Sequence, residues 1–328
     1  MQYIILAVLV VFVTARGSYY VDELDKKTKL SGALIGGVLL AVVTSLPELI
    51  TTLTSTIALQ NPGMAFGNVF GSNLFNFLIL AVVDLLFIKH LFFNKTRDNV
   101  STVSLGLIMY VTFILPIVMM GMGLLNLDWL GISIGLSFNV ISLVIITIYV
   151  ISVRRMGHDL LPKSVRGSKH KLSTINMRFA FYATLVVVVS YMITHVASEL
   201  SETLNMSASF GGALLLGAAT SLPEFTAVIT LFKLRNYAVA VGNVVGSNIF
   251  NMLILSIVDL VYIKENIYRV FDDDVLFKNI SLLLILGALN SIMVLVALKR
   301  KAPNTTIIYI LPSVTIILLY GVYIVLSL

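Results

Sequence analysis

The chain has 328 residues, 58% of them hydrophobic and only 12% charged, and its mean hydropathy is +1.00. Soluble domains are roughly half apolar and a quarter charged, so the composition excludes an ordinary soluble domain and indicates a membrane protein. The formal net charge of +6 does not indicate a nucleic-acid partner, because the basic residues lie between apolar runs. The absence of cysteine excludes disulfides and thiolate metal sites.

Apolar runs of about 20 residues recur along the chain, as in helical membrane proteins and unlike the alternating pattern of an outer-membrane barrel. The first run has no Lys or Arg before Arg16, so we expect a transmembrane helix and not a cleaved signal peptide. Residues 19–29 are charged and predict a loop. About ten helices are expected, at residues 1–15, 31–58, 64–88, 102–122, 129–153, 176–200, 209–232, 237–263, 276–298 and 305–327.

The basic residues between these runs predict the orientation of the chain. If successive connections alternate between the two membrane faces, all Lys and Arg residues fall on one side except Lys264, Arg269 and Lys278. Positive residues mark the cytoplasmic side, so we expect a multi-pass protein of the cell membrane with both termini extracellular. Residues 154–175 form the longest connection and predict a basic cytoplasmic loop beside anionic lipid.

Two stretches of the chain are nearly the same sequence. Residues 44–48 and 220–224 both read TSLPE, while residues 67–76 read GNVFGSNLFN and residues 242–251 read GNVVGSNIFN. If each half holds five helices, an odd number, the second half crosses the membrane in the opposite sense, as in many secondary transporters. We therefore expect an all-α polytopic membrane protein with two inverted-topology five-helix repeats, at residues 1–153 and 176–328.

The TSLPE motif predicts a broken helix that offers oxygen atoms. Pro47 has no N–H, so the carbonyl group of Val43 loses its helical partner, and Pro223 repeats this effect. Unwound backbone at membrane depth must be buried or line a polar cavity, where free carbonyl groups suit Na⁺ or Ca²⁺. Glu48 lies one helical turn after Thr44, on the same face. The corresponding pair in the second half is Thr220 and Glu224.

The second motif predicts a polar stripe on the following helix. Asn68, Ser72 and Asn76 recur every four residues, and so do Asn243, Ser247 and Asn251. Glycine pairs at 67/71 and 242/246 let a neighbouring backbone approach closely. Asn and Ser in membrane helices often bind only a neighbouring helix, whereas an intramembrane Glu indicates function because burying its charge is costly. The motifs contain no His or Cys that would favour zinc or copper.

Three other polar residues have simpler interpretations. His195 lies near a helix end beside Glu199 and is expected at the interface, not as a ligand. Asp84 and Asp259 lie two turns beyond Asn76 and Asn251, where they either line an ion entrance or are solvated at a helix end.

The two motifs, present in both halves, resemble the paired repeats of the sodium/calcium exchanger family, of prokaryotic type, within the wider calcium:cation antiporter group. The resemblance covers essentially the whole chain and implies electrogenic exchange of Ca²⁺ for Na⁺ by alternating access. It implies Glu48 and Glu224 as the central bidentate Ca²⁺ ligands, and backbone carbonyl groups from Thr44 and Thr220. It also implies flanking Na⁺ sites completed by Ser45, Ser72, Ser221 and Ser247, and remaining central positions filled by Asn76 and Asn251.

The chain departs from the family pattern in two places. Family members commonly have Gly before the Thr-Ser pair, where this chain has Val43 and Ala219. Sodium-coupled members usually carry Asp where Asn251 stands, so this site holds two carboxylates and not three. Two carboxylates neutralise one Ca²⁺ and hold fewer Na⁺ ions or protons without excess charge, so either counter-ion remains open.

We therefore expect a secondary active antiporter that exchanges Ca²⁺ for a monovalent cation, with no cofactor and no enzymatic activity. Its partners are inorganic cations and the lipid bilayer, and its oligomeric state is open. The alternatives are an H⁺-coupled or other-cation exchanger of the same fold and, less favoured, a cation channel. An intramembrane enzyme is a third class, but the two acids are glutamates that follow proline and no nucleophile motif accompanies them.

Overall fold

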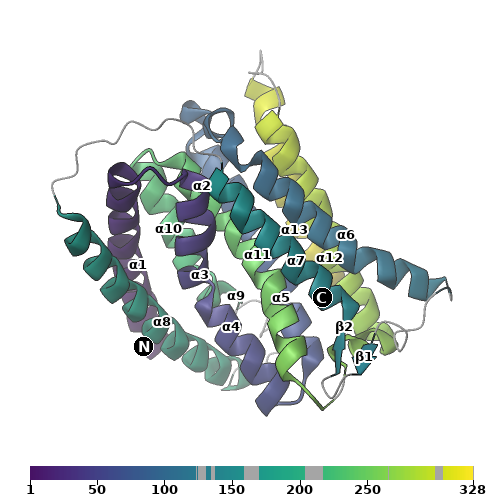
Figure 1. Ribbon diagram of the computed structural model, residues 1–328. Helices are drawn as coiled ribbons and strands as arrows, with labels where there is room; N and C mark the ends of the chain where they lie inside the picture. The colour runs from purple at the N-terminus through teal and green to yellow at the C-terminus, as the bar shows by residue number, and fades with distance from the viewer. Residues whose placement is uncertain are drawn as a thin grey trace.

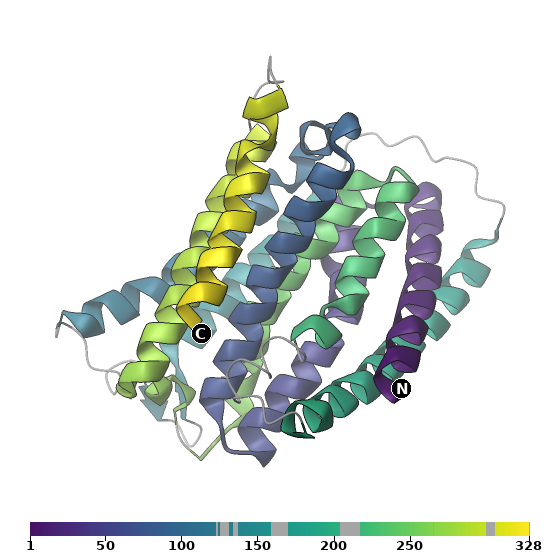
Figure 2. The same cartoon turned by 180° about the vertical axis from the view of Figure 1, so that it is seen from behind.

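The computed structural model describes residues 1–122, 124, 131–133, 137–158, 170–203, 217–264, 266–299 and 306–327, and these residues form a bundle of long helices (Figures 1 and 2). Seven described helices are long and apolar enough to cross a membrane, and a bent pair of helices makes an eighth candidate span. The seven are α1 (Gln2–Lys27), α5 (Pro62–Leu86), α6 (Val100–Gly121), α8 (Leu172–Thr203), α11 (Tyr237–Val261), α12 (Asp274–Lys299) and α13 (Thr306–Ser327). The chain is therefore a helical protein with several membrane spans.

Shorter elements complete the described part of the chain. A two-stranded hairpin, β1 (Gly131–Ser133) and β2 (Ser137–Asn139), precedes α7 (Val140–His158). The helix expected at residues 129–153 therefore begins at Val140, eleven residues later than expected, because Gly131–Ser133 and Ser137–Asn139 are extended strands. The helix expected at 209–232 is described only from α9 (Gly217–Thr220) and α10 (Leu222–Lys233) onward, and its first part lies outside the described residues.

The bent pair is the second span, and it includes the first TSLPE motif. It consists of α2 (Gly32–Leu34), a π-helix at Ile35–Leu40, α3 (Ala41–Thr44), α4 (Leu46–Leu53) and a second π-helix at Thr54–Ala58. Its two parts differ in direction by 43°. The bend lies at Ser45 (φ −96°, ψ 7°), and Pro47 follows in the first turn of α4, where a missing N–H costs nothing. The predicted break is confirmed.

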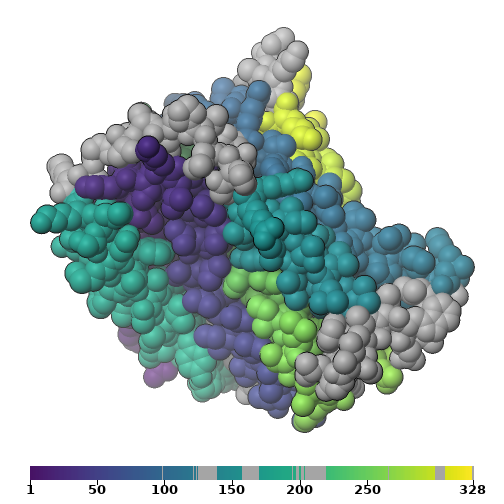
Figure 3. Space-filling view, in the orientation of Figure 1, coloured from purple at the N-terminus to yellow at the C-terminus, as the bar shows by residue number. Residues whose placement is uncertain are grey.

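Ser221 has the same backbone conformation in the second half, with φ −90° and ψ 2° between α9 and α10. In the space-filling view, the bent span runs down the molecule between α8 on one side and α7 and α11 on the other (Figure 3).

Helices α5 and α11 are the central pair, and they run in opposite directions. At one end Phe66, near the start of α5, packs edge-on against Phe271, which follows α11. At the other end Phe87, which follows α5, packs against Phe232, which precedes α11. Both helices are 25 residues long and largely buried. The two copies of the Gly-Asn motif therefore lie antiparallel in the centre of the bundle.

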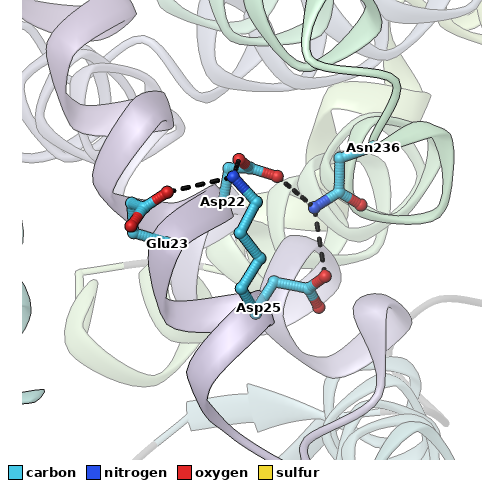
Figure 4. Close-up of polar contacts among 5 residues, drawn as sticks. Asp22, Glu23, Asp25 and Asn236 are labelled. Atoms are coloured by element: carbon cyan, nitrogen blue, oxygen red, sulfur yellow. Dashed lines mark hydrogen bonds and ion pairs between the residues drawn. The ribbon is translucent and has the colours of Figure 1, made fainter. Parts of the chain in front are cut away.

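The loop expected at residues 19–29 is wrong, because α1 continues through this segment to Lys27. Asp22 and Asp25 are buried there, and both accept hydrogen bonds from the side-chain amide of Asn236, at 2.9 and 3.1 Å (Figure 4). Lys26 pairs with Asp22 and with Glu23, at 2.6 and 3.0 Å. Because these charges have partners, the helix does not have to end where the charged segment begins.

Several basic connections meet at one end of the bundle. The Lys27 ammonium group donates to the carbonyl oxygen of His170 at 2.6 Å. Ser31 donates to the carbonyl oxygen of Met156. Lys95 lies over the ring of Tyr237, 5.4 Å from its centroid. The connections that follow α1, α5, α7 and α10 therefore lie together, as the alternation of the basic residues predicts.

Candidate cation site

The ten residues that the sequence analysis assigns to cation sites are all buried in the structure. We call them the central site: Thr44, Ser45, Glu48, Ser72, Asn76, Thr220, Ser221, Glu224, Ser247 and Asn251. None of these side chains is more than 2% exposed. They come from the two helix breaks and from α5 and α11, so the bend of each broken helix faces the centre of the bundle.

Glu224 is bound by residues of both halves. Ser45 donates to Glu224 Oε1 at 3.1 Å, and Ser247 Oγ lies 3.4 Å from the same oxygen. Thr44 also lies beside this carboxyl group. The break of the first-half helix therefore contacts the glutamate of the second half.

The surroundings of Glu48 are related to those of Glu224. Thr220 lies beside Glu48 just as Thr44 lies beside Glu224, and the two carboxyl groups are near enough for their charges to interact. Two like charges in a buried site repel unless a cation or a proton lies with them. The pair is thus suited to holding a positive charge.

The polar stripes contact different partners. Thr44 Oγ1 lies 3.3 Å from Asn243 Oδ1 and 3.4 Å from Ser247 Oγ, so the stripe on α11 faces the first helix break. Asn68 instead donates to Thr52 Oγ1 of its own half, at 3.1 Å. The two stripes are therefore not used in the same way in this conformation.

Two further asparagines, absent from the sequence prediction, occupy the crossing of α5 and α11. Asn73 donates to the backbone carbonyl oxygen of Asn248 at 3.1 Å, and Asn248 donates to that of Asn73 at 3.3 Å. Asn76 donates to Asn248 Oδ1 at 2.9 Å, and Asn251 donates to Asn73 Oδ1 at 3.0 Å. Their signal in the sequence is that both directly follow the motif serine in the two repeats.

Many oxygen atoms of the central site are buried without a hydrogen bond to any described residue. They are Glu48 Oε1 and Oε2, Glu224 Oε2, Ser72 Oγ, Ser221 Oγ, Asn76 Oδ1 and Asn251 Oδ1. Buried polar atoms normally have partners, and hard cations take six to eight oxygen ligands. Where the chain is described, no three His, Cys, Asp or Glu residues group in a way that could hold a metal. A cation here would rest on two carboxylates and neutral oxygens.

The glycine pairs give a mixed outcome. A Cβ at Gly246 would lie 2.2 Å from the carbonyl oxygen of Gly37, so the close approach expected for the second pair is confirmed. A Cβ at Gly36 would likewise lie 2.2 Å from the carbonyl oxygen of Val239. For Gly67 and Gly71, no described atom lies within 4 Å of such a Cβ.

Asp84 and Asp259 are buried, so the interpretation as solvated helix ends is wrong. Asp84 accepts hydrogen bonds from Tyr309 at 2.7 Å and from Ser313 at 2.5 Å, both on α13. Asp259 accepts the backbone N–H of Asn139 at 2.8 Å. Each acid therefore ties a central helix to another part of the bundle.

Tyr268 and His195 both lie near helix ends, but Tyr268 is buried and His195 is exposed. Burial raises the pKa of the Tyr268 hydroxyl group, which shares a 2.9 Å hydrogen bond with Ser142. His195 lies 3.8 Å from Glu199, at the surface as the sequence predicts.

Comparisons with known proteins place the chain in a family. The model of the sodium/calcium exchanger protein family matches residues 2–156 and 177–328. Inner membrane protein YrbG of Escherichia coli (strain K12) is 26% identical over 250 residues, which cover 75% of this chain and 74% of YrbG. The Ca(2+)/H(+) antiporter ChaA of Bacillus subtilis (strain 168) is 26% identical over 262 residues, which cover 75% of this chain and 72% of ChaA.

Solved structures share the fold. The sodium-calcium exchanger NCX_Mj soaked with 2.5 mM Na⁺ and 1 mM Sr²⁺ aligns with a TM-score of 0.67 at 17% identity, covering 99% of this chain and 96% of that chain. A second NCX_Mj structure, with 0.1 mM Sr²⁺, gives 0.64 at 18% identity, covering 99% and 97%. The family match spans nearly the whole chain on both sides of the basic connection. The chain belongs to the sodium/calcium exchanger protein family.

Proposed function

We propose that this protein is a secondary active antiporter that exchanges Ca²⁺ for a monovalent cation across the membrane by alternating access. One observation carries the proposal: Glu48 and Glu224, from different halves of the chain, lie near each other in a buried site, and each adjoins the motif threonine of the other half. Intramembrane carboxylates are costly and mark ion pathways. Two carboxylates balance the charge of one Ca²⁺.

The residues of the central site have distinct roles in this proposal. Glu48 and Glu224 bind Ca²⁺ directly, and their surroundings of neutral oxygens match the preference of Ca²⁺ for oxygen ligands. The backbone carbonyl groups of Thr44 and Thr220 and the side-chain oxygens of Asn76 and Asn251 complete the central position. The serines supply the flanking positions for the monovalent cation: Ser45, Ser72, Ser221 and Ser247.

Alternating access in this proposal depends on two inverted repeats. The antiparallel α5 and α11 and the reciprocal contacts of Asn73 and Asn248 support such a relationship. In many transporters of this kind the two repeats move against each other around a fixed site. The end of the bundle where the basic connections meet is the cytoplasmic end in this proposal, with both termini on the extracellular side.

A second candidate function is Ca²⁺/H⁺ exchange by the same site. Two observations favour it: the relative ChaA is named a Ca(2+)/H(+) antiporter, and the central site holds only two acids, with an amide at Asn251. Protons need only the two glutamates, whereas several Na⁺ ions in the same site need more negative charge.

Flux measurements in proteoliposomes test both candidates. Purified protein is reconstituted, and uptake of radioactive Ca²⁺ is followed under an outward Na⁺ gradient and, separately, under a pH gradient. Uptake driven by the Na⁺ gradient supports the first candidate, and uptake driven only by the pH gradient supports the second. Ca²⁺ flux that no counter-ion gradient drives, at rates far above transporter turnover, indicates a channel. No Ca²⁺ flux in any condition rejects the proposal.

A further inference from the structure

The orientation of four asparagine side chains follows from two backbone groups at the crossing of α5 and α11. A carbonyl oxygen can only accept a hydrogen bond, and it retains a second lone pair besides the one used within the helix. The side-chain group that faces the Asn248 carbonyl oxygen at 3.1 Å is therefore the NH₂ of Asn73. By the same reasoning the NH₂ of Asn248 faces the carbonyl oxygen of Asn73 at 3.3 Å.

These two orientations determine the next two. With its NH₂ committed, Asn73 presents Oδ1 to the other side, where Asn251 must supply a donor and does so at 3.0 Å. Asn248 presents Oδ1 to Asn76, which donates at 2.9 Å. The oxygen and nitrogen of an amide are exchangeable by rotation in most settings, but here the backbone decides which atom points where.

As a result, two amide oxygens have no hydrogen-bond partner among the residues that the structure describes. Asn76 Oδ1 and Asn251 Oδ1 are buried and make no hydrogen bond to the described residues. Each residue lies one helical turn beyond a motif serine, on the same face of its helix. On α11 that serine, Ser247, lies within 3.4 Å of Glu224. The free oxygens therefore lie on the face that turns toward the glutamates.

We propose that Asn73 and Asn248 are positioning residues that hold Asn76 and Asn251 with their amide oxygens available to a cation. An ionised Asp at position 251 would set a carboxylate oxygen against Asn73 Oδ1, two acceptors with no proton between them, whereas a protonated Asp could donate there as the amide does. The cation-binding part of this inference rests on the proposed function, whereas the amide orientation does not.

Thermal unfolding of Asn73→Asp in detergent, without Ca²⁺, tests the orientation. An ionised aspartate at position 73 cannot donate to the Asn248 carbonyl oxygen, whereas a protonated one can. Relative to wild type at the same pH, we expect the melting temperature to be about 5 °C lower near pH 8 and to recover as the pH falls toward about 5. Asn248→Asp is the matched variant and should behave in the same way.

Two controls separate this effect from general damage. Asn73→Ala removes the donor and adds no titratable group, so its deficit should stay constant with pH. Asn68→Asp places an acid against the Thr52 hydroxyl, which can turn to donate to it, so no recovery at low pH is expected. The proposal is overturned if the melting temperatures of Asn73→Asp and Asn248→Asp stay as far below that of wild type at low pH as at high pH. It is also overturned if both aspartate variants fail to fold at low pH while the alanine variants fold.

Transport measurements test the positioning role. In Asn73→Ala the amide of Asn251 is free to turn, and in Asn248→Ala the amide of Asn76 is free to turn. We therefore expect the KM for Ca²⁺ to rise about tenfold while Vmax changes much less, because one oxygen ligand is no longer held toward the ion. An unchanged KM in both variants contradicts the positioning role. If wild-type protein transports no Ca²⁺, the proposed function fails, and the unfolding measurements still decide the amide orientation.

Discussion

Asn73 and Asn248 each donate a side-chain N–H to the backbone carbonyl oxygen of the other, at 3.1 and 3.3 Å. The two residues hold equivalent positions in the repeated motif, 175 residues apart (73 to 248), on helices that run antiparallel. A contact of this kind is its own counterpart under a two-fold rotation. Equivalent substitutions in the two halves should therefore have similar effects close to this crossing and different effects where the halves differ.

Replacement of either glutamate by glutamine should abolish Ca²⁺ transport. Glu48→Gln and Glu224→Gln keep the side-chain shape and remove one of the two charges, so we expect Ca²⁺ uptake to fall about 100-fold or more, the loss of a direct charged ligand. The melting temperature without Ca²⁺ should stay the same or rise, because the repulsion between the two carboxyl groups is removed.

The matched control for the glutamine variants is Glu199→Gln on α8, because the Glu199 side chain is 67% exposed. It should leave both uptake and melting temperature unchanged. Wild-type rates of uptake by Glu48→Gln would show that this residue is not a Ca²⁺ ligand.

Addition of a third acid should be tolerated only when the opposing oxygen is removed. In the wild type, Asn73 Oδ1 accepts a hydrogen bond from the Asn251 side chain at 3.0 Å. Asn251→Asp replaces this donor with a carboxylate oxygen. We expect the single variant to lose about 2 kcal/mol of stability, the cost of a buried acceptor without its donor. In the Asn73→Ala background the same change should cost less, and a double-mutant cycle by denaturant or thermal unfolding measures the difference. Additive effects would mean that the two side chains are not coupled.

Much of the fold is predictable from the sequence because bilayer chemistry constrains it strongly. The apolar runs at 64–88 and 237–263 correspond to α5 (Pro62–Leu86) and α11 (Tyr237–Val261) within two residues. The bend at Ser45 follows from the missing N–H of Pro47. The burial of Glu48 and Glu224 in one site follows from their repetition in a motif that is too costly to leave in lipid.

Other features depend on partners far along the chain, and the local sequence does not identify those partners. The charges at the end of α1 indicate a loop only until Asn236 is known to bind Asp22 and Asp25. Asp84 and Asp259 appear solvated because Tyr309 and Asn139 are distant in sequence. Asn73 lies off the stripe of its helix, so its role is visible only once α5 crosses α11.

The contact between the first π-helix and α11 should tolerate no added methyl group. A Cβ at Gly246 would lie 2.2 Å from the carbonyl oxygen of Gly37, and backbone cannot move aside as a flexible side chain can. We expect Gly246→Ala to lower stability by about 2–3 kcal/mol, as overpacking does, measured by thermal unfolding. Gly106→Ala is the control, since its Cβ would meet Ile249 at an ordinary 3.5 Å. Equal melting temperatures for the two variants would contradict this packing.

The two asparagines that precede α5 and α11 should respond oppositely to conversion into aspartate. Asn61 accepts the Met64 backbone N–H at 3.0 Å as the N-cap of α5, and an Asp at position 61 accepts equally well. Asn236 holds the equivalent position, 175 residues later, but donates to Asp22 and Asp25 (Figure 4). An Asp at position 236 loses both bonds and adds a third negative charge beside them.

The balance of terms gives the sign of each effect. A negative charge at a helix N-terminus contributes about 0.5–1 kcal/mol, whereas two lost bonds to carboxylates cost about 3 kcal/mol or more. We therefore expect Asn61→Asp to be neutral or stabilising and Asn236→Asp to be destabilising by about 2 kcal/mol or more. Asn236→Ala should lose the two bonds without the added repulsion, so raising the salt concentration from about 0.05 to about 0.5 M should restore part of the stability of Asn236→Asp and none of that of Asn236→Ala. Thermal unfolding of the three variants at both salt concentrations measures this, and the absence of any salt-dependent recovery in Asn236→Asp would mean that the acids of α1 do not face position 236.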